Sequence, residues 1–438
     1  MKLDVVEDRC PQCATALTRP EMGQAWCPAC EWNLRIYDPA VVAARGWRRL
    51  DRWGHGLATR LDGTLFARFA LERPSRPGWT AARIVLVTIS TLLTLLTLAC
   101  LGVGILLIVD GFPNWFMVPG VLLILVAVAL RPRLGRPPRQ GALRRERAPT
   151  LYALVDRVAA AARAPTPRII AVTPDFNAGS GRVGMRRQTL LELGMALWIT
   201  MPAQLRVALI AHEIGHTING DPNRALVVQP ALSTFRMVAD ASGADRSIGE
   251  VTRFRPELRI WVRFVVLIGG LLLWMVSRVF LLISVGLSAL ALRDHQRAEY
   301  LADAIAADVA GTGAAAELLD RLVLSPSIMH LIECNADTTP PKRWGALAGS
   351  LAARRTADLP VLRQLTERHT SLWSSHPPLG LRARLVEVRP ASEPLVTLSE
   401  EDSRSIDQEL AGWYAATHRR ILGTRDYREL PARRATFS

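Results

Sequence analysis

Residues 211–221 read AHEIGHTINGD, and this stretch decides the fold that we expect for the chain. Apolar residues at three- and four-residue spacing from Pro202 onward predict a helix, which the glycine at position 220 ends. His212 and His216 then project from one helix face, one turn apart. Two imidazoles so placed bind zinc, and Glu213 is positioned as a general base toward a metal-bound water. Taken alone, the motif also fits a pair of core histidines.

A catalytic zinc needs a third protein ligand and an open fourth position. The extended pattern with a third histidine ten residues after the first fails, because that position is Pro222. In HQRAEYLADAIAADVA, residues 295–310, Glu299 and Asp303 lie one turn apart on one face of an amphipathic helix. We expect Glu299 to complete the zinc ligands and Asp303 to accept a hydrogen bond from a ligand histidine's second nitrogen. Solvated surface acids are the alternative interpretation of this pair.

Three ordered motifs, HEIGHTINGD, EYLAD and SSHPPLGLRARL, resemble the HtpX-like family of membrane zinc metallopeptidases, relatives of the CaaX prenyl proteases. The resemblance covers roughly residues 151–385. It implies that His212, His216 and Glu299 bind the zinc and that Glu213 is the base. The chain is therefore expected to be a zinc metalloendopeptidase.

The same resemblance assigns residues around the zinc. It maps Asp303 onto the family's Glu-x-x-x-Asp motif, and it implies that His376 and Arg382 lie near the substrate carbonyl, where donor groups stabilise an oxyanion. The sequence departs from the family in the strand motif ahead of the zinc helix, where Asn177-Ala178 is followed by glycines. If that strand pairs with an extended peptide substrate, its geometry is expected to differ.

Two uncharged apolar runs, 84–109 and 112–130, are each long enough to cross a hydrocarbon core of roughly 30 Å. Arginines flank both runs and the connection between them carries none, so the positive-inside rule predicts a hairpin with cytoplasmic flanks. The net charge of +15 is thus assigned to a membrane surface, and nucleic acid is disfavoured. We expect an integral protein, of a bacterial cytoplasmic membrane, with its active site facing the cytoplasm.

Four of the six cysteines form two Cys-x-x-Cys pairs, Cys10 with Cys13 and Cys27 with Cys30. Four thiolates at this spacing predict a structural zinc site, similar to a zinc ribbon, and a cytoplasmic location disfavours the alternative of disulfides. Such a module binds a protein or nucleic-acid partner and performs no chemistry. The remaining histidines outside the motifs, His55 among them, lack ligand spacing and are interpreted as surface or packing residues.

The fold class expected is mainly α: a membrane-embedded helical metalloprotease with a zincin-like core, a small β element and a zinc ribbon. The predicted divisions are a ribbon at 1–38, a basic amphipathic linker at 39–83, a transmembrane hairpin at 84–130, a metallopeptidase domain at 131–394, and a polar tail at 395–438.

The apolar segment 264–292 imposes a topological constraint. As one spanning helix it would place His216 and Glu299 on opposite sides of the bilayer, where they could share no metal. Arg278 splits the segment into two runs that are short for spans. We expect a short or re-entrant hairpin that turns near Arg278. An extra span at 225–238, or a segment lying on the protein surface, are the alternatives.

The function predicted is hydrolysis of peptide bonds in unfolded or membrane-derived proteins, with one catalytic and one structural Zn²⁺. Two alternatives stay open: a non-catalytic membrane scaffold whose ribbon recruits a partner, and processing of prenylated proteins. The sequence leaves the oligomeric state and the natural substrate undetermined.

Overall fold

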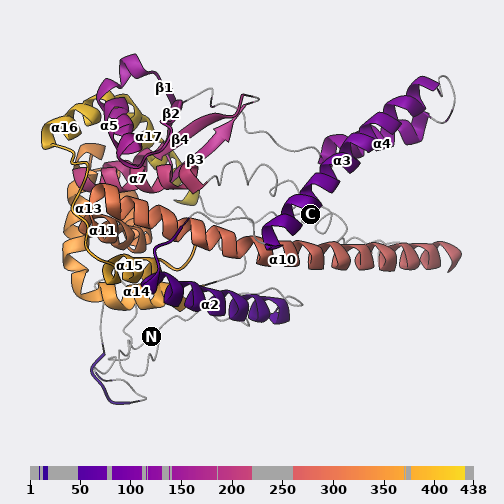
Figure 1. Cartoon of the computed structure of the whole chain (residues 1–438), viewed down its shortest axis with the longest axis horizontal. Coiled ribbons are helices and arrows are strands. Elements are labelled where there is room, and N and C mark those ends of the chain that lie inside the picture. The colour runs from indigo at the N-terminus through magenta and orange to yellow at the C-terminus, as the bar shows by residue number, and fades with distance from the viewer. Residues whose placement is uncertain are drawn as a thin grey trace. The chain divides into compact units, whose positions relative to one another are not determined.

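The computed structural model describes residues 9, 13–17, 48–75, 81–110, 115, 117–130, 138, 141–184, 186–219, 260–368, 370 and 376–429. These residues are mainly helical, with one small sheet (Figure 1). The chain divides into two compact units. The larger unit comprises residues 1–76, 136–219 and 296–438, and the smaller unit comprises 77–135 and 220–295.

The larger unit contains a four-stranded sheet of order β1-β2-β4-β3. The strands are β1 (Ala142–Leu143), β2 (Ile169–Thr173), β3 (Ala178–Val183) and β4 (Gln188–Gly194). β2 and β4 run parallel, whereas β1 and β3 are antiparallel to their neighbours. In this order β3 is an edge strand, and its glycines leave a regular six-residue ladder with β4 intact. The predicted small β element is confirmed.

Helices complete the larger unit and bury its main core. They are α5 (Pro149–Ala161), α6 (Met195–Ile199), α7 (Ala203–Asn219), α11 (Thr312–Val323), α12 (Ser325–Asn335), α13 (Trp344–Arg354), α14 (Leu359–Arg368) and α15 (Leu379–Val388). The core is centred on fully buried side chains of α6, α7 and α13, including Trp198, Ile210 and Trp344. α7 buries apolar residues at helical spacing, as predicted for the stretch after Pro202.

The expected hairpin in residues 264–292 is wrong. α10 (Ile260–Ala310) is one continuous helix of 51 residues, which carries this whole segment together with Glu299. It contains no proline, the residue that most reliably breaks a helix. Arg278 needs no turn, because its guanidinium lies over the Trp274 ring, 5.1 Å from the ring centroid.

Two segments predicted as peripheral belong to the larger unit. The linker at 39–83 contains α2 (Arg48–Leu71), which buries Ala58, Asp62, Leu65 and Phe69 at helical spacing. The tail at 395–438 contains α16 (Glu400–Glu409) and α17 (Ala411–Glu429), whose apolar residues join the main core. Both segments are amphipathic, and low average hydrophobicity hid the buried face of each helix from a reading of composition.

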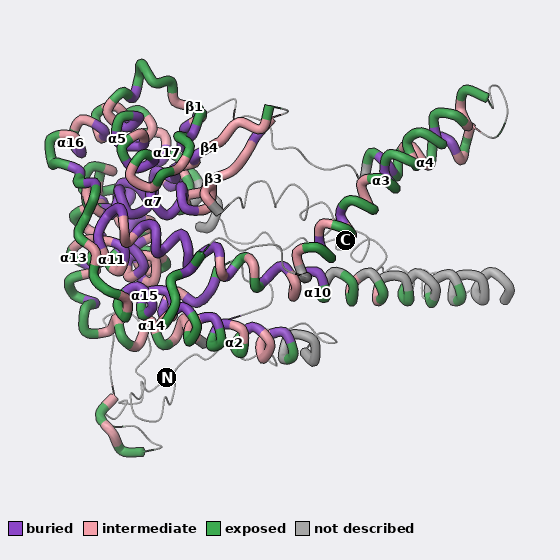
Figure 2. The backbone as a smooth tube through the Cα atoms, in the orientation of Figure 1, coloured by how far each residue is buried: buried purple, intermediate pink, exposed green. Residues whose placement is uncertain are grey.

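The smaller unit contains the apolar helices α3 (Ala81–Asp110) and α4 (Met117–Leu130), which pack closely where Gly104 meets Gly120. Their side chains are largely unburied (Figure 2). Among the described residues, one helix, Arg83–Asp110, is long and apolar enough to cross a membrane. α4 is shorter than the second span that the sequence predicted, because its 14 residues rise only about 21 Å.

The predicted zinc ribbon lies almost wholly outside the described residues. Cys13 is described and exposed, whereas Cys10, Cys27 and Cys30 are not described. A β-bridge joins Arg9 to Ala16 around this first cysteine pair. The four-thiolate site therefore stays a prediction.

Candidate metal centre

His212, His216 and Glu299 place one ligand atom each around a common point in the larger unit. The two Nε2 atoms lie 3.2 Å apart. Glu299 Oε2 lies 3.6 Å from Nε2 of His212, and Glu299 Oε1 lies 3.5 Å from Nε2 of His216. Ligand atoms on a tetrahedron around zinc are about 3.3 Å apart, given zinc–nitrogen bonds of 2.0–2.1 Å. The three side chains thus fit a single zinc ion, as MxxxM-type spacing on α7 and a distant acid on α10 require.

A glycine brings the two ligand-bearing helices together. α7 supplies both histidines and α10 supplies the acid, and they cross where Gly215 faces Ala302. A Cβ atom at position 215 would lie 2.8 Å from Ala302 Cα, closer than real side chains approach. The absence of that atom lets the helix backbones meet, and the ligands one residue or one turn away come within bonding reach of one metal.

Asp303 occupies the position predicted for it, behind a ligand histidine. Its Oδ1 lies 3.0 Å from Nδ1 of His212, so that nitrogen carries the proton and donates it to the carboxylate. The tautomer leaves the lone pair on Nε2, which points toward the other ligands. Asp303 is buried, so the hydrogen bond is shielded from competing water.

Arg382 is buried against both acids of the site. Its Nε and Nη2 donate to the two carboxylate oxygens of Asp303 at 2.8 and 2.7 Å, and its Nη1 lies 2.9 Å from Glu299 Oε2. Burial alone raises the pKa of each carboxyl, but the guanidinium and the histidines outweigh it and hold both pKa values below the usual range. The contacts therefore favour ionised acids. They show Arg382 holding acid side chains, and its predicted role at the substrate carbonyl stays a prediction.

Glu213 lies next to the first ligand histidine on α7 and is 7% exposed. None of the described residues forms a hydrogen bond or ion pair with its carboxylate. The oxygens therefore keep their lone pairs for a ligand from outside the chain, which is what a general base toward water requires.

His376 reaches the centre from the segment ahead of α15. Its Nδ1 lies 2.6 Å from Glu299 Oε1, and its side chain is 57% exposed. It is therefore the most accessible of the predicted site residues and lies at the solvent side of the buried acids. A donor in this position is suited to meet a substrate group, as predicted.

The sequence analysis missed a second polar group next to the centre. Asp62 of α2 is 2% exposed and binds Thr370 and Gln296, close in the chain to His376 and Glu299 respectively. The only local signal was an acid on the apolar face of an amphipathic helix, where buried carboxylates are rare.

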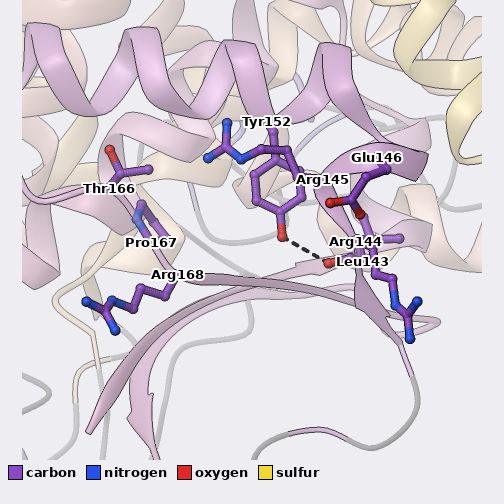
Figure 3. Close-up of a pocket in the computed structure, with 8 residues that line it drawn as sticks. All are labelled: Leu143, Arg144, Arg145, Glu146, Tyr152, Thr166, Pro167 and Arg168. Atoms are coloured by element: carbon purple, nitrogen blue, oxygen red, sulfur yellow. Dashed lines mark hydrogen bonds between the residues drawn. The ribbon is translucent and has the colours of Figure 1, made fainter. Parts of the chain in front are cut away.

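A separate pocket of about 740 Å³ lies between the start of the sheet and α5 (Figure 3). Its arginines are Arg144, Arg145 and Arg168, and Tyr152 donates a hydrogen bond to the Leu143 carbonyl on its floor. Arg145 pairs with Asp156 across 2.6 Å, so part of the positive charge is neutralised. No metal-ligating or nucleophilic group lines this pocket.

Comparison with known proteins identifies one family. The family model of peptidase family M48 matches residues 145–389, which contain every described residue of the metal centre. Searches of the curated proteins and of the solved structures gave no significant match.

Proposed function

Because the chain belongs to peptidase family M48 and is a metallopeptidase acting on peptide bonds, we propose that it is a membrane-bound zinc endopeptidase cleaving unfolded or membrane-derived polypeptides at the cytoplasmic face. The observation that carries the proposal is the set of three ligand atoms spaced for one zinc, with an unpaired carboxylate beside them. His212, His216 and Glu299 would hold the metal, which when bound polarises the scissile carbonyl and acidifies water.

The chain's own residues supply the remaining chemistry. Glu213 takes a proton from the attacking water and passes it to the leaving amine. Asp303 keeps His212 in the tautomer that presents Nε2, and Arg382 balances the charge of the two buried acids. His376, exposed beside Glu299, donates toward the carbonyl oxygen as negative charge develops.

The edge strand β3 supports an extended polypeptide as substrate. It contacts α7, and its outer side is unpaired among the described strands. An unfolded segment could add to this edge through main-chain hydrogen bonds, which select for extended backbone more than for particular side chains. Gly179 and Gly181 leave open space where side chains would stand, so bulky substrate residues are tolerated there.

A membrane location is supported by the apolar helix Arg83–Asp110, whose large side chains, such as Leu92 and Val109, are more than half exposed. Exposed apolar surface on this scale is costly in water and is the normal surface of a helix in lipid. The basic flanks of residues 84–130 favour the cytoplasmic side. Protease protection of inside-out and right-side-out vesicles measures that orientation directly.

Glu213→Gln tests the catalytic proposal. In detergent, zinc-loaded wild type should cleave an unfolded model substrate, and chelation should stop it. The variant should bind the same zinc and lose at least about a hundredfold in kcat, since it keeps every ligand and lacks the base. Equal cleavage by both chains would refute the assignment. If neither cleaves and zinc is lost only on replacing Cys10, Cys13, Cys27 and Cys30, the scaffold alternative gains. Cleavage restricted to prenylated peptides would favour prenyl-protein processing.

A further inference from the structure

A buried polar cluster connects α2 to both chain segments that complete the metal centre. Its hub is Asp62, which is 2% exposed. Asp62 Oδ2 accepts a hydrogen bond from Thr370 Oγ1 at 2.6 Å, and Oδ1 accepts one from Gln296 Nε2. α2 lies outside the residues that match the family, so the family resemblance does not account for this cluster.

The first connection reaches the segment that carries His376. Thr370 precedes that histidine by six residues and is held twice by α2. Besides the bond to Asp62, the Thr370 carbonyl accepts a hydrogen bond from Nδ1 of His55 at 2.7 Å. His55 and Asp62 are seven residues apart and share one helix face. One helix face therefore fixes both the side chain and the backbone of Thr370.

The second connection reaches the turn of α10 that carries Glu299. Gln296 lies one turn before this acid, and the next residue, Tyr300, packs its ring on Phe69 of α2 with centroids 5.7 Å apart. Leu65 belongs to the same apolar cluster. α2 thus contacts α10 on both sides of Glu299, by a hydrogen bond before it and by aromatic packing after it.

We infer that Asp62 is a positioning residue of the peptidase, which holds the Glu299 turn and the His376 segment at the spacing that the zinc and the substrate require. This inference rests on the proposed function. A carboxylate with two good donors and no positively charged side chain bonded to it is an expensive way to dock a helix, since burying a charge opposes folding. An apolar residue at position 62 would dock α2 at lower cost. The retained polar cluster is therefore explained by geometry that it imposes on the site.

Four single variants of the full chain test the inference. Asp62→Ala removes the hub, and Thr370→Val removes one donor with little change in shape. Thr370→Ser keeps the hydroxyl and serves as the conservative rescue. Leu65→Ala is the packing control: it weakens the same helix contact without touching the hydrogen bonds. Each is measured well below its own unfolding temperature, for kcat and KM and for zinc affinity in chelator competition. Zinc at the centre is defined as the part of the binding that His212→Ala removes.

Asp62→Ala and Thr370→Val should each lower kcat about tenfold, and Asp62→Ala should weaken zinc binding by a similar factor, as loss of supporting contacts does around metals. Thr370→Ser should restore most of the kcat. The double variant Asp62→Ala/Thr370→Val should lose less than the product of the single losses. If Asp62→Ala behaves like Leu65→Ala in both kcat and zinc affinity, the inference is overturned. Failure of wild type to cleave any peptide would sink the proposed function alone, because the comparison of zinc affinities still decides the role of Asp62.

Discussion

At the scale of single residues, the metal centre combines three ligands with a layer of charged groups that set their protonation. Asp303 fixes the proton on one imidazole, and Arg382 keeps both acids ionised. Each of these groups is buried and has several partners, so removing one leaves others unsatisfied. The centre is therefore expected to respond strongly to changes in residues that never touch the metal.

Asp303→Asn tests this dependence. The amide keeps the shape of the carboxylate but loses the charge that attracts His212 and Arg382, so zinc affinity or kcat should fall by about 10–100-fold. The measurement is zinc affinity by chelator competition, alongside peptide cleavage. Asp308→Asn is the matched control, because Asp308 lies on the same helix in an ion pair with Arg73 whose side chain is 61% exposed. Equal losses in the two variants would contradict the role of Asp303.

Asp62 predicts a specific dependence of stability on pH. Burial raises the pKa of Asp62 from 3.8 to about 6, against the opposing effects of the Thr370 hydrogen bond and of His55. The folded state then binds the proton more tightly than the unfolded state does. This contribution to stability is full below pH 3.8 and is lost as pH rises through about 6.

On lowering the pH from about 7.5 to about 5, wild type should therefore gain about 1 kcal/mol in free energy of unfolding relative to Asp62→Asn. Denaturant unfolding of both chains in detergent measures it, and the other titrating groups largely cancel in the comparison. His55 and Tyr300 are the titratable groups nearest to Asp62. An identical pH response of the two chains would show that Asp62 keeps an ordinary pKa in the folded state.

The sequence could predict the residues whose spacing is local, and it missed those joined only by the fold. His212 and His216 share a helix face through their spacing alone, and the acids on α10 repeat the argument. Asp62 and Thr370 are 308 residues apart in the chain, so no periodicity or motif brings them together. His55 was interpreted as an ordinary histidine for the same reason, although it holds the Thr370 carbonyl.

At the scale of elements, the crossing of α7 and α10 determines whether a metal can bind. Gly215→Ala should weaken zinc binding at least about tenfold, because the new methyl group would stand 2.8 Å from Ala302 Cα and push the helices apart. Alanine is otherwise the better helix former by about 1 kcal/mol, so a loss cannot come from helix propensity.

Gly349→Ala in α13 is the matched control for this crossing. Position 349 is inside a helix and has no atom within 4 Å of an added Cβ, so the same substitution should leave zinc binding unchanged and raise the melting temperature slightly. Zinc affinity and thermal unfolding of the two variants are compared. Unaltered zinc affinity in Gly215→Ala would mean that the helices can separate without disturbing the ligands.

Sequence reasoning predicted helix α7 correctly and misjudged α10. For α7, a starting proline and an apolar stripe agreed with each other. For α10, one arginine within an apolar segment was interpreted as a turn, yet a single charge is compatible with a continuous helix when its side chain finds a partner. Arg278 finds one in Trp274, one turn away on the same helix. Charge alone does not break hydrogen-bonded backbone.

At the scale of the whole molecule, the continuous α10 moves the topological constraint to another part of the chain. His216 and Glu299 bind the same point, so any bilayer crossing between them must be matched by a second one. A crossing by the apolar half of α10 would need its match within residues 220–259, which lie outside the described residues. The alternatives of an extra span and of a surface segment therefore both stay open, and only the turn near Arg278 is removed.

The C-terminal segment, predicted as a polar tail, is expected to be essential for folding of the larger unit. α16 and α17 bury Ile406, Leu410, Tyr414 and Ile421 in the main core. Burial of an apolar side chain stabilises a protein by about 1.5–3 kcal/mol, so these four contribute an amount comparable with the whole stability of a domain. Glu409 also accepts hydrogen bonds from two backbone N–H groups at the start of α5.

Deletion of residues 395–438 should therefore abolish cooperative unfolding and zinc binding at His212 and His216, whereas deletion of residues 1–38 should preserve both. The second deletion is the control, because the sequence predicts that segment to be a separate zinc module. Thermal unfolding, protease resistance and zinc content of the two shortened chains are measured against the full chain. The N-terminal deletion should lose one zinc and keep its melting temperature. A cooperative transition in the C-terminal deletion would show that α16 and α17 only cover a core that is stable without them, and unfolding of the N-terminal deletion would show that residues 1–38 are part of the peptidase fold.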